Sequence, residues 1–267
     1  MPIKWRQAWK QHAKRALGLT RVADLPSTRV IWTGFSPYDG APIMAVVQCG
    51  REESRNVKTG DMMQIAIMRR DIAPGPAYAA GKDTSCCPED CIHRSEARGG
   101  LNTCYVDKHR LYAAWGAAVE IVEAGDVGVP DGYFKGVRVR FGNEGDPAAV
   151  PFEVWKPIAD EADAFTGYTA DWRNLGPEWR ELFMASVSSP ADAIRARAAG
   201  WRFFASSGRE SDDAAFAKLG RECNATAHGV SCVACLGCDG TGRGERRPSW
   251  WLPFHGPTGA VHRRRAE

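Results

Sequence analysis

Four cysteines near the end of the chain constrain its fold more than any other feature. Cys232, Cys235 and Cys238 recur at every third position, and Cys223 precedes them. Two intervening residues let a short loop turn back, so that successive thiolates reach one metal centre. This is the spacing of ferredoxin-type iron–sulfur ligands, with Cys223 as fourth thiolate, and the same set suits tetrahedral zinc. The pattern therefore predicts a closed metal site but does not decide which metal it binds.

Disulfides, or thiols packed as small apolar side chains, are the alternatives to metal ligation. The chain has nine cysteines in 267 residues and no recognisable secretory signal. It is also much larger than the usual disulfide-stapled scaffold. We therefore expect a reducing, cytoplasmic compartment, in which clustered cysteines are metal ligands.

A second cysteine group lies in the middle of the chain, at Cys86, Cys87, Cys91 and Cys104. Cys87, Cys91 and Cys104 are the predicted metal ligands here, and either Cys86 or His93 completes a set of four. Alternatively, three ligands leave one metal position open, as chemistry at a cluster or at catalytic zinc requires.

The central spacing departs from the usual radical S-adenosylmethionine signature, which has cysteine gaps of three and then two residues. That signature places its third cysteine at position 94, where this chain has Arg94. We take Arg94 as a candidate cofactor-binding residue. A cluster of that type, with S-adenosylmethionine as a further cofactor, would have to be an unorthodox one.

Two other positions are candidates for chemistry. Asp146 follows a predicted strand, where a carboxylate can act as general base or orient a substrate. The alternative is that Asp146, which precedes Pro147, caps a helix. Tyr168 follows another predicted strand and is a candidate to stack on a cofactor or a base, although aromatic residues in this segment suit core packing equally well.

The fold prediction is an α/β domain with parallel strands. Strands are expected at 27–33, 42–49, 61–69, 135–141, 164–169, 182–187 and 201–205, and helices at 105–123 and 151–162. The clearest unit has Ser189 as helix N-cap, Pro190 at the first position and Gly200 as terminator. Strand, short helix and strand imply parallel pairing, in an open sheet or a partial (β/α) barrel. Residues 74–83 are expected to form a loop.

Charge is concentrated at the two ends of the chain. The net charge of +3 is small, but residues 4–15 contain no acid, and three arginines lie near the C-terminus at 263–265. We expect a basic helix at 1–26, an α/β domain at 27–222 and a cysteine-rich lobe at 223–267. The basic ends suit a nucleic acid or nucleotide partner. No apolar run approaches the roughly 20 residues of a membrane span, so no membrane partner is expected.

Several short motifs resemble an uncharacterised family of cysteine-rich phage and prophage proteins. They occur at 56–64, 91–94 with 104–106, 145–151, 167–169 with Trp172, 184–187 and 232–240. The family pattern has histidine where Ala170 stands and cysteine where Phe183 stands, so these two positions carry no essential chemistry here. More distantly, the central group is similar to phage proteins with diverged radical-SAM-like barrels.

The resemblance implies a phage-type metalloprotein in the cytoplasm of a bacterial host. One interpretation is an iron–sulfur enzyme that modifies nucleotides or DNA at an open cluster. The other is a zinc-stabilised nucleic-acid-binding, structural or host-interaction protein without catalysis. Whether the chain is an enzyme is left open by its sequence.

Overall fold

The computed structural model of the chain describes residues 28–48, 58–96, 99–242 and 247–254. The strands are β1 (Arg29–Phe35), β2 (Pro42–Val47), β3 (Met63–Arg69), β4 (Arg138–Phe141), β5 (Ala164–Thr166), β6 (Tyr168–Thr169), β7 (Met184–Val187), β8 (Phe203–Ser207), β9 (Arg221–Glu222) and β10 (Trp250–Pro253). The helices are α2 (Pro74–Ala79), α3 (Tyr112–Glu123), α4 (Phe152–Glu161), α5 (Trp179–Leu182), α6 (Pro190–Ala198), α7 (Glu210–Leu219), α8 (Asn224–Ala227) and α9 (Cys232–Cys235). Three 3-10 turns are η2 (Lys82–Ser85), η4 (Lys108–Leu111) and η5 (Pro147–Ala149).

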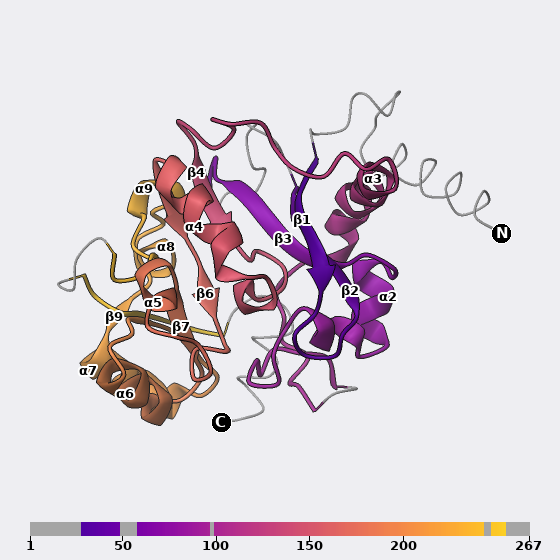
Figure 1. Cartoon of the computed structure of the whole chain (residues 1–267). Helices are drawn as coiled ribbons and strands as arrows, with labels where there is room; N and C mark the ends of the chain where they lie inside the picture. The colour runs from indigo at the N-terminus through magenta and orange to yellow at the C-terminus, as the bar shows by residue number, and fades with distance from the viewer. Residues whose placement is uncertain (1–27, 49–57, 97–98, 243–246, 255–267) are drawn as a thin grey trace.

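The strands form two five-stranded sheets, in the orders β1-β2-β3-β4-β5 and β6-β7-β8-β10-β9 (Figure 1). β1, β2 and β3 pair antiparallel, whereas β3, β4 and β5 pair parallel. All pairings in the second sheet are parallel. The predicted α/β class with parallel strands is confirmed. The sequence did not show that β4 lies in a different sheet from β7 and β8.

Gly167 joins the two sheets. The segment 164–169, predicted as one strand, is interrupted at this residue, with β5 paired to β4 before it and β6 paired to β7 after it. The Gly167 N–H donates to the Cys238 carbonyl at 2.9 Å, and its own carbonyl accepts from Met184 at 3.1 Å. A Cβ at this position would lie 2.8 Å from the Phe183 ring. Glycine therefore allows the close approach that passes the chain from one sheet to the other.

The unit around α6 is as the sequence predicted. The Ser189 hydroxyl accepts from the Asp192 N–H at 3.1 Å, which satisfies one of the free donors of the first turn. Pro190 occupies the first helical position, and Gly200 has a φ of 80°. β7 and β8, on either side of this helix, pair parallel.

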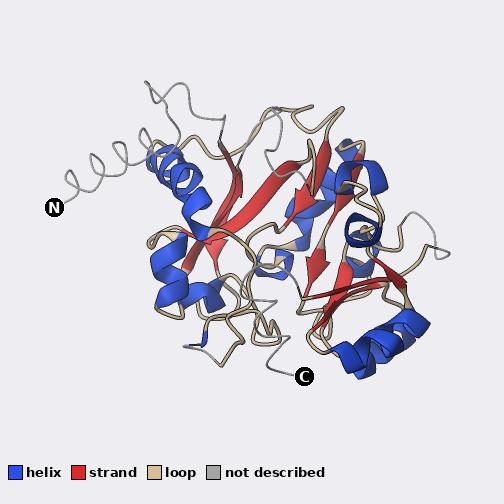
Figure 2. Ribbon diagram, turned by 180° about the vertical axis from the view of Figure 1, so that it is seen from behind, coloured by secondary structure: helices blue, strands red, loops and turns tan. Residues whose placement is uncertain are grey.

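Helices α4, α6 and α7 pack on one face of the parallel strands (Figure 2). The apolar cluster on this face includes Val139 and Phe141 from β4, Trp155 from α4 and Phe216 from α7. Trp155 is fully buried, and its indole N–H donates to the Pro147 carbonyl at 3.0 Å. A separate cluster lies between α3 and the opposite face of β1, β2 and β3. The parallel strands therefore keep one face that α4, α6 and α7 do not cover.

Three parts of the chain differ from the prediction or extend it. Residues 74–83 contain α2 and the start of η2 instead of a loop. Pro74 begins α2 because proline lacks only an N–H that the first turn leaves free. The helix predicted to start at residue 105 begins at Tyr112, after η4, which Asp107 caps.

The segment predicted as a cysteine-rich lobe at 223–267 contributes a strand to the sheet, because β10 pairs with both β8 and β9. The basic helix predicted at 1–26 and the arginines at 263–265 lie outside the described residues. None of the helices in the described ranges is long and apolar enough to cross a membrane.

Candidate functional site

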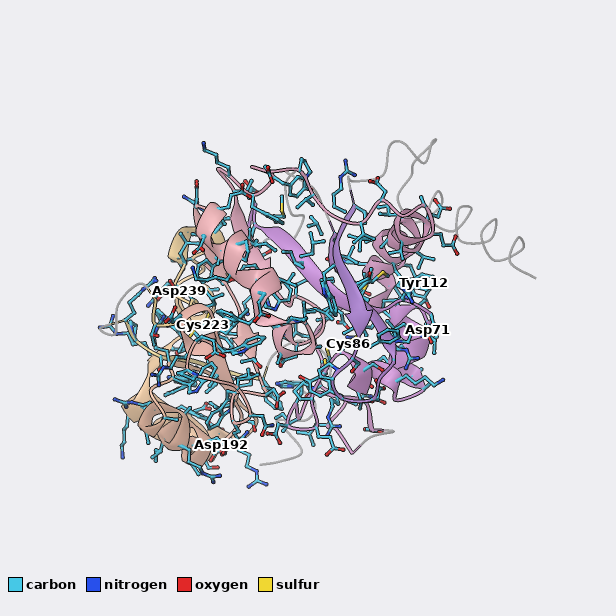
Figure 3. The ribbon with its side chains drawn as sticks, in the orientation of Figure 1. Asp71, Cys86, Tyr112, Asp192, Cys223 and Asp239 are labelled. Atoms are coloured by element: carbon cyan, nitrogen blue, oxygen red, sulfur yellow. The ribbon has the colours of Figure 1, made fainter. Side chains whose placement is uncertain are left out.

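The two cysteine groups lie at opposite ends of the parallel strands. The central group belongs to the segment that follows the carboxyl end of β3. The C-terminal group is bound to the amino ends, since the Cys232 N–H donates to the Lys58 carbonyl at 2.9 Å, just before β3. Arg138, which begins β4, donates to the Val233 carbonyl at 3.1 Å. Figure 3 labels Cys86 and Cys223, one from each group, in separate parts of the molecule.

A short hairpin-like pairing holds Cys91 and Cys104 close together. The Leu101 N–H donates to the Ile92 carbonyl at 2.7 Å, and the Cys104 N–H donates to the His93 carbonyl at 3.1 Å. Cys91 and Cys104 are near enough for the charge of one to raise the pKa of the other, although burial is the larger cause for Cys104. The twelve residues between them in sequence therefore do not separate them in space.

A buried ion pair lies against Cys104. Lys108 Nζ is 2.7 and 2.5 Å from the two Glu144 carboxylate oxygens and 3.4 Å from Cys104 Sγ. Burial alone would lower the pKa of Lys108, but the charges of Glu144 and Cys104 outweigh it and raise that pKa. Lys108 is therefore a fixed cation beside the thiol. The Cys86 thiol lies near Glu144 as well, and its pKa is raised by burial and by this carboxylate.

Cys87 and Cys91 share a hydrogen bond. Cys87 is the donor, so the bond raises the pKa of Cys87 and lowers that of Cys91. Cys91 is therefore the thiol of the pair that ionises first. Cys87 also lines an open cavity of about 660 Å³, together with Tyr38, Asp39 and Asp171. This cavity gives the central group an approach from solvent.

Asp146 has the capping position that was the alternative to catalysis. Its Oδ1 accepts from the Ala148 N–H at 3.0 Å at the start of η5, and its Oδ2 accepts from the Ala170 N–H at 2.6 Å. Burial nevertheless raises the pKa of Asp146 to about 6. The carboxylate thus joins the end of β4 to the end of β6. It is not among the residues that line the cavities described here.

Arg94 and His93 lie on the central hairpin. Arg94 Nε donates to the Cys91 carbonyl at 2.9 Å, so the guanidinium braces the backbone of a predicted ligand. His93 Nδ1 lies 2.7 Å from Thr103 Oγ1, and its ring is 5.1 Å from that of Phe254. In this arrangement His93 is therefore not placed as the fourth ligand of the central group. It lines the cavity described below.

The C-terminal cysteines belong to the crossover between β9 and β10. Asn224 Nδ2 donates to Cys235 Sγ at 3.2 Å, and Cys232 and Cys235 occupy the ends of α9. Burial raises the pKa of Cys238 to about 12, and the neighbouring Cys223, Cys232 and Cys235 act in the same direction. The Tyr168 hydroxyl donates to the Cys238 thiol. All four thiols are therefore electrostatic neighbours.

A cavity of about 110 Å³ lies between the two cysteine groups, on the strand face that α4, α6 and α7 leave open. Its walls are Lys58, Thr59, His93, Thr103, Tyr105, Arg140, Tyr168, Phe204, Ser206, Cys223, Cys232, Cys238, Leu252 and Phe254. The strand residues among these alternate with members of the apolar core, as Arg140 does with Val139 and Phe141. The open face of the parallel strands is thus a partly polar pocket.

The thiols are suitable ligands for a soft metal, but their side chains are not arranged around a common point. Thiolates select zinc and iron–sulfur clusters, and Cys223, Cys232 and Cys238 line one cavity. All eight cysteines of the described ranges are free. However, no three His, Cys, Asp or Glu side chains within those ranges are arranged to hold a metal ion. Metal binding at either group would therefore require the thiols to turn toward a common point.

No sequence motif marks Lys108, Glu144 or Arg140 as a site residue. Lys108 begins η4 and Glu144 follows β4, 36 positions later, so the two meet only through the tertiary fold. Arg140 lies within the strand predicted at 135–141. Its position on the polar face, between two apolar neighbours, was the available indication. No protein-family model, curated protein or solved structure matched the chain.

Proposed function

We propose that this chain is a metalloprotein whose central cysteines, Cys87, Cys91 and Cys104, form a reaction centre at one end of a partial (β/α) barrel. The observation that carries the proposal is the position of these cysteines after the carboxyl end of β3, the first parallel strand. Active sites of parallel α/β folds lie at this end, because the loops that follow the strands meet there.

The order of the strands supports the barrel. β3, β4 and β5 are neighbours in chain order, and β6, β7 and β8 continue that order beyond Gly167. A doubly wound sheet instead reverses its order at a switch point and carries helices on both faces. Here α4, α6 and α7 share one apolar cluster, and the other face holds the cavity over β4, β6, β8 and β10. Helix α3 covers that other face only over β1, β2 and β3.

The neighbours of the central group suit an open centre. Lys108 is a fixed cation beside Cys104. In the hydrogen-bonded pair of Cys87 and Cys91, Cys91 is the thiol whose pKa is lowered. An iron–sulfur cluster held by these thiolates would supply one-electron chemistry. The C-terminal cysteines would hold a structural metal, either zinc or a cluster. A nucleotide or DNA substrate remains part of the proposal on the strength of the family resemblance.

The test is anaerobic purification followed by analysis of iron, sulfide and zinc per chain and by a visible spectrum. The proposal expects iron and sulfide with the broad visible absorption of thiolate-bound clusters. Removal of Cys91 by serine substitution should abolish part of this absorption and leave the C-terminal metal in place. A colourless protein with stoichiometric zinc would contradict the proposal of an iron–sulfur enzyme and favour the zinc-stabilised module.

The zinc-stabilised module makes its own prediction, which concerns DNA. Binding through the basic ends, residues 4–15 and 263–265, should weaken steeply as salt rises, because each phosphate contact releases a counterion. Removal of both ends should abolish the binding. Binding that is unaffected by salt would exclude these ends as the contact.

A further inference from the structure

We infer that the enclosed cavity binds the carboxylate or phosphate group of a small organic anion, with Arg140 as its anchor. The inference adds a ligand to the proposed function. It rests on that function only in the statement that this anion is the substrate. It assigns a ligand to a pocket that the cysteine motifs do not explain.

Arg140 is a buried cation that has no carboxylate partner among the described residues. The residue is 8% exposed and lies in the middle of β4. Its Nη2 donates to the Tyr105 hydroxyl at 2.7 Å, while its buried Nε has no hydrogen-bond partner. Arg202, which is also buried, is paired with Asp239 at 2.9 Å. Within the described ranges no such ion pair compensates Arg140.

No carboxylate lies among the groups around Arg140 in the cavity. Its polar neighbours there include the hydroxyls of Tyr105 and Tyr168 and the thiols of Cys232 and Cys238. None of the described residues that line the cavity is an aspartate or a glutamate. A buried guanidinium without a counter-charge is costly, so an anion that enters the cavity gains a strong, charge-assisted partner.

The walls of the cavity define the rest of the ligand. Tyr105, Tyr168, Phe204 and Phe254 supply aromatic surfaces, and Leu252 adds an aliphatic one. The guanidinium lies 5.9 Å from the centre of the Tyr168 ring, so both can contact a ligand of modest size. A flat, unsaturated body that carries one anionic group fits these walls in chemistry.

The cavity also adjoins the proposed reaction centre. His93 and Thr103 line it, and each lies within two residues of a central cysteine, Cys91 or Cys104. Tyr105, the partner of Arg140, directly follows Cys104. An anion held by Arg140 would therefore lie beside the hairpin that carries two of the three proposed ligands, as a substrate should.

The experiment measures binding to the full chain, purified with its metals, by isothermal titration calorimetry. The probes are benzoate, phenyl phosphate and inorganic phosphate, with neutral benzyl alcohol as the comparison. We expect benzoate or phenyl phosphate to bind more tightly than benzyl alcohol. Arg140→Gln should weaken that binding by at least about tenfold, because it removes a charge-assisted pair. Comparison of the affinities for benzoate and phenyl phosphate shows whether the anionic group is a carboxylate or a phosphate.

The control is Arg110→Gln, which removes the same charge from an exposed arginine paired with Asp107. It should leave the affinity unchanged. If Arg140→Gln does not fold, Tyr105→Phe keeps the ring and removes the hydroxyl that orients the guanidinium. That variant should weaken anion binding severalfold and leave benzyl alcohol unaffected.

Three results would overturn the inference. One is equal affinity for benzyl alcohol and the anions, and another is unchanged anion binding in Arg140→Gln. The third is loss of bound metal from Arg140→Gln in a chain that binds none of the probes, since Arg140 would then balance a metal–thiolate centre. Anion binding by a chain without iron would instead support this inference while the iron–sulfur proposal failed.

Discussion

Arg202 and Asp239 form a buried ion pair that fastens the C-terminal cysteine segment to the second sheet. Arg202 Nη1 lies 2.9 Å from Asp239 Oδ1, and the two side chains are 5% and 1% exposed. Arg202 also donates to the carbonyls of Gly237 and Gly240 on either side of Cys238 and Asp239. Figure 3 shows Asp239 in the same part of the molecule as Cys223. The fold thus fixes Cys238 independently of any metal.

We predict that Asp239→Ala destabilises the protein strongly. It leaves Arg202 buried without its carboxylate, and breaking one side of a buried pair costs about 3–5 kcal/mol. Arg247, which also pairs with Asp239, loses its partner too. Chemical denaturation of the wild type and the variant measures the difference.

The matched control for this variant is Asp160→Ala. It breaks the pair between Lys156 and Asp160, whose side chains are 44% and 60% exposed. Exposed pairs contribute about 0–1 kcal/mol, so this variant should change stability little. Equal losses in the two variants would show that burial of the Arg202 pair has no special effect.

Helix α6 gives a smaller and cleaner test. Ser189→Ala removes the hydroxyl that accepts from the Asp192 N–H and should cost about 1 kcal/mol of unfolding free energy. Ser189→Asp should retain most of that stability, because aspartate is an equally good cap. Thermal unfolding of both variants checks the prediction. An unchanged midpoint for Ser189→Ala would mean that the cap does not stabilise the fold.

Local signals predicted the elements that local chemistry determines. Ser189, Pro190 and Gly200 marked the ends of α6 correctly, because capping and left-handed backbone are properties of single residues. The buried apolar run of β2 was also placed within two residues. Helix α2 was missed, because its two prolines and one glycine disfavour a helix that tertiary contacts nevertheless stabilise.

Contacts between distant segments were beyond the sequence patterns. Gly167 divides a predicted strand between two sheets, and this depends on the approach of Cys238 from 71 positions later. For the same reason the pair of Lys108 and Glu144 and the isolated charge of Arg140 appeared only in the structure. The two cysteine groups were recognised from spacing alone. Their location at opposite ends of the strands was not.

Serine substitutions should separate the roles of the two cysteine groups. Cys232→Ser and Cys235→Ser should lower stability and soluble yield, since structural metal binding contributes directly to folding. Cys91→Ser and Cys104→Ser should leave a folded protein that has lost one metal centre. The measurement is metal content per chain together with thermal unfolding of each variant.

Cys86→Ser provides the comparison within the central group. Cys86 is 5% exposed and belongs to the apolar core, so its loss should affect packing and leave metal content unchanged. The proposal of an open centre would be contradicted if Cys91→Ser and Cys104→Ser unfold as readily as Cys232→Ser and no ligand-accessible metal is found. Both groups would then be structural.

Asp146 should make stability depend on pH in the direction opposite to a salt-bridged carboxylate. Burial raises its pKa from 3.8 to about 6, so the folded state holds the proton more tightly than the unfolded state. Its contribution to stability is therefore full below pH 3.8, falls as pH rises and is lost above about pH 6. About two pKa units correspond to about 3 kcal/mol. The wild type should lose this amount relative to Asp146→Asn from well below pH 3.8 to well above pH 6 in paired denaturation curves, and most of it between these two values. A relative gain would show instead that the Ala148 and Ala170 N–H groups outweigh burial and favour the carboxylate.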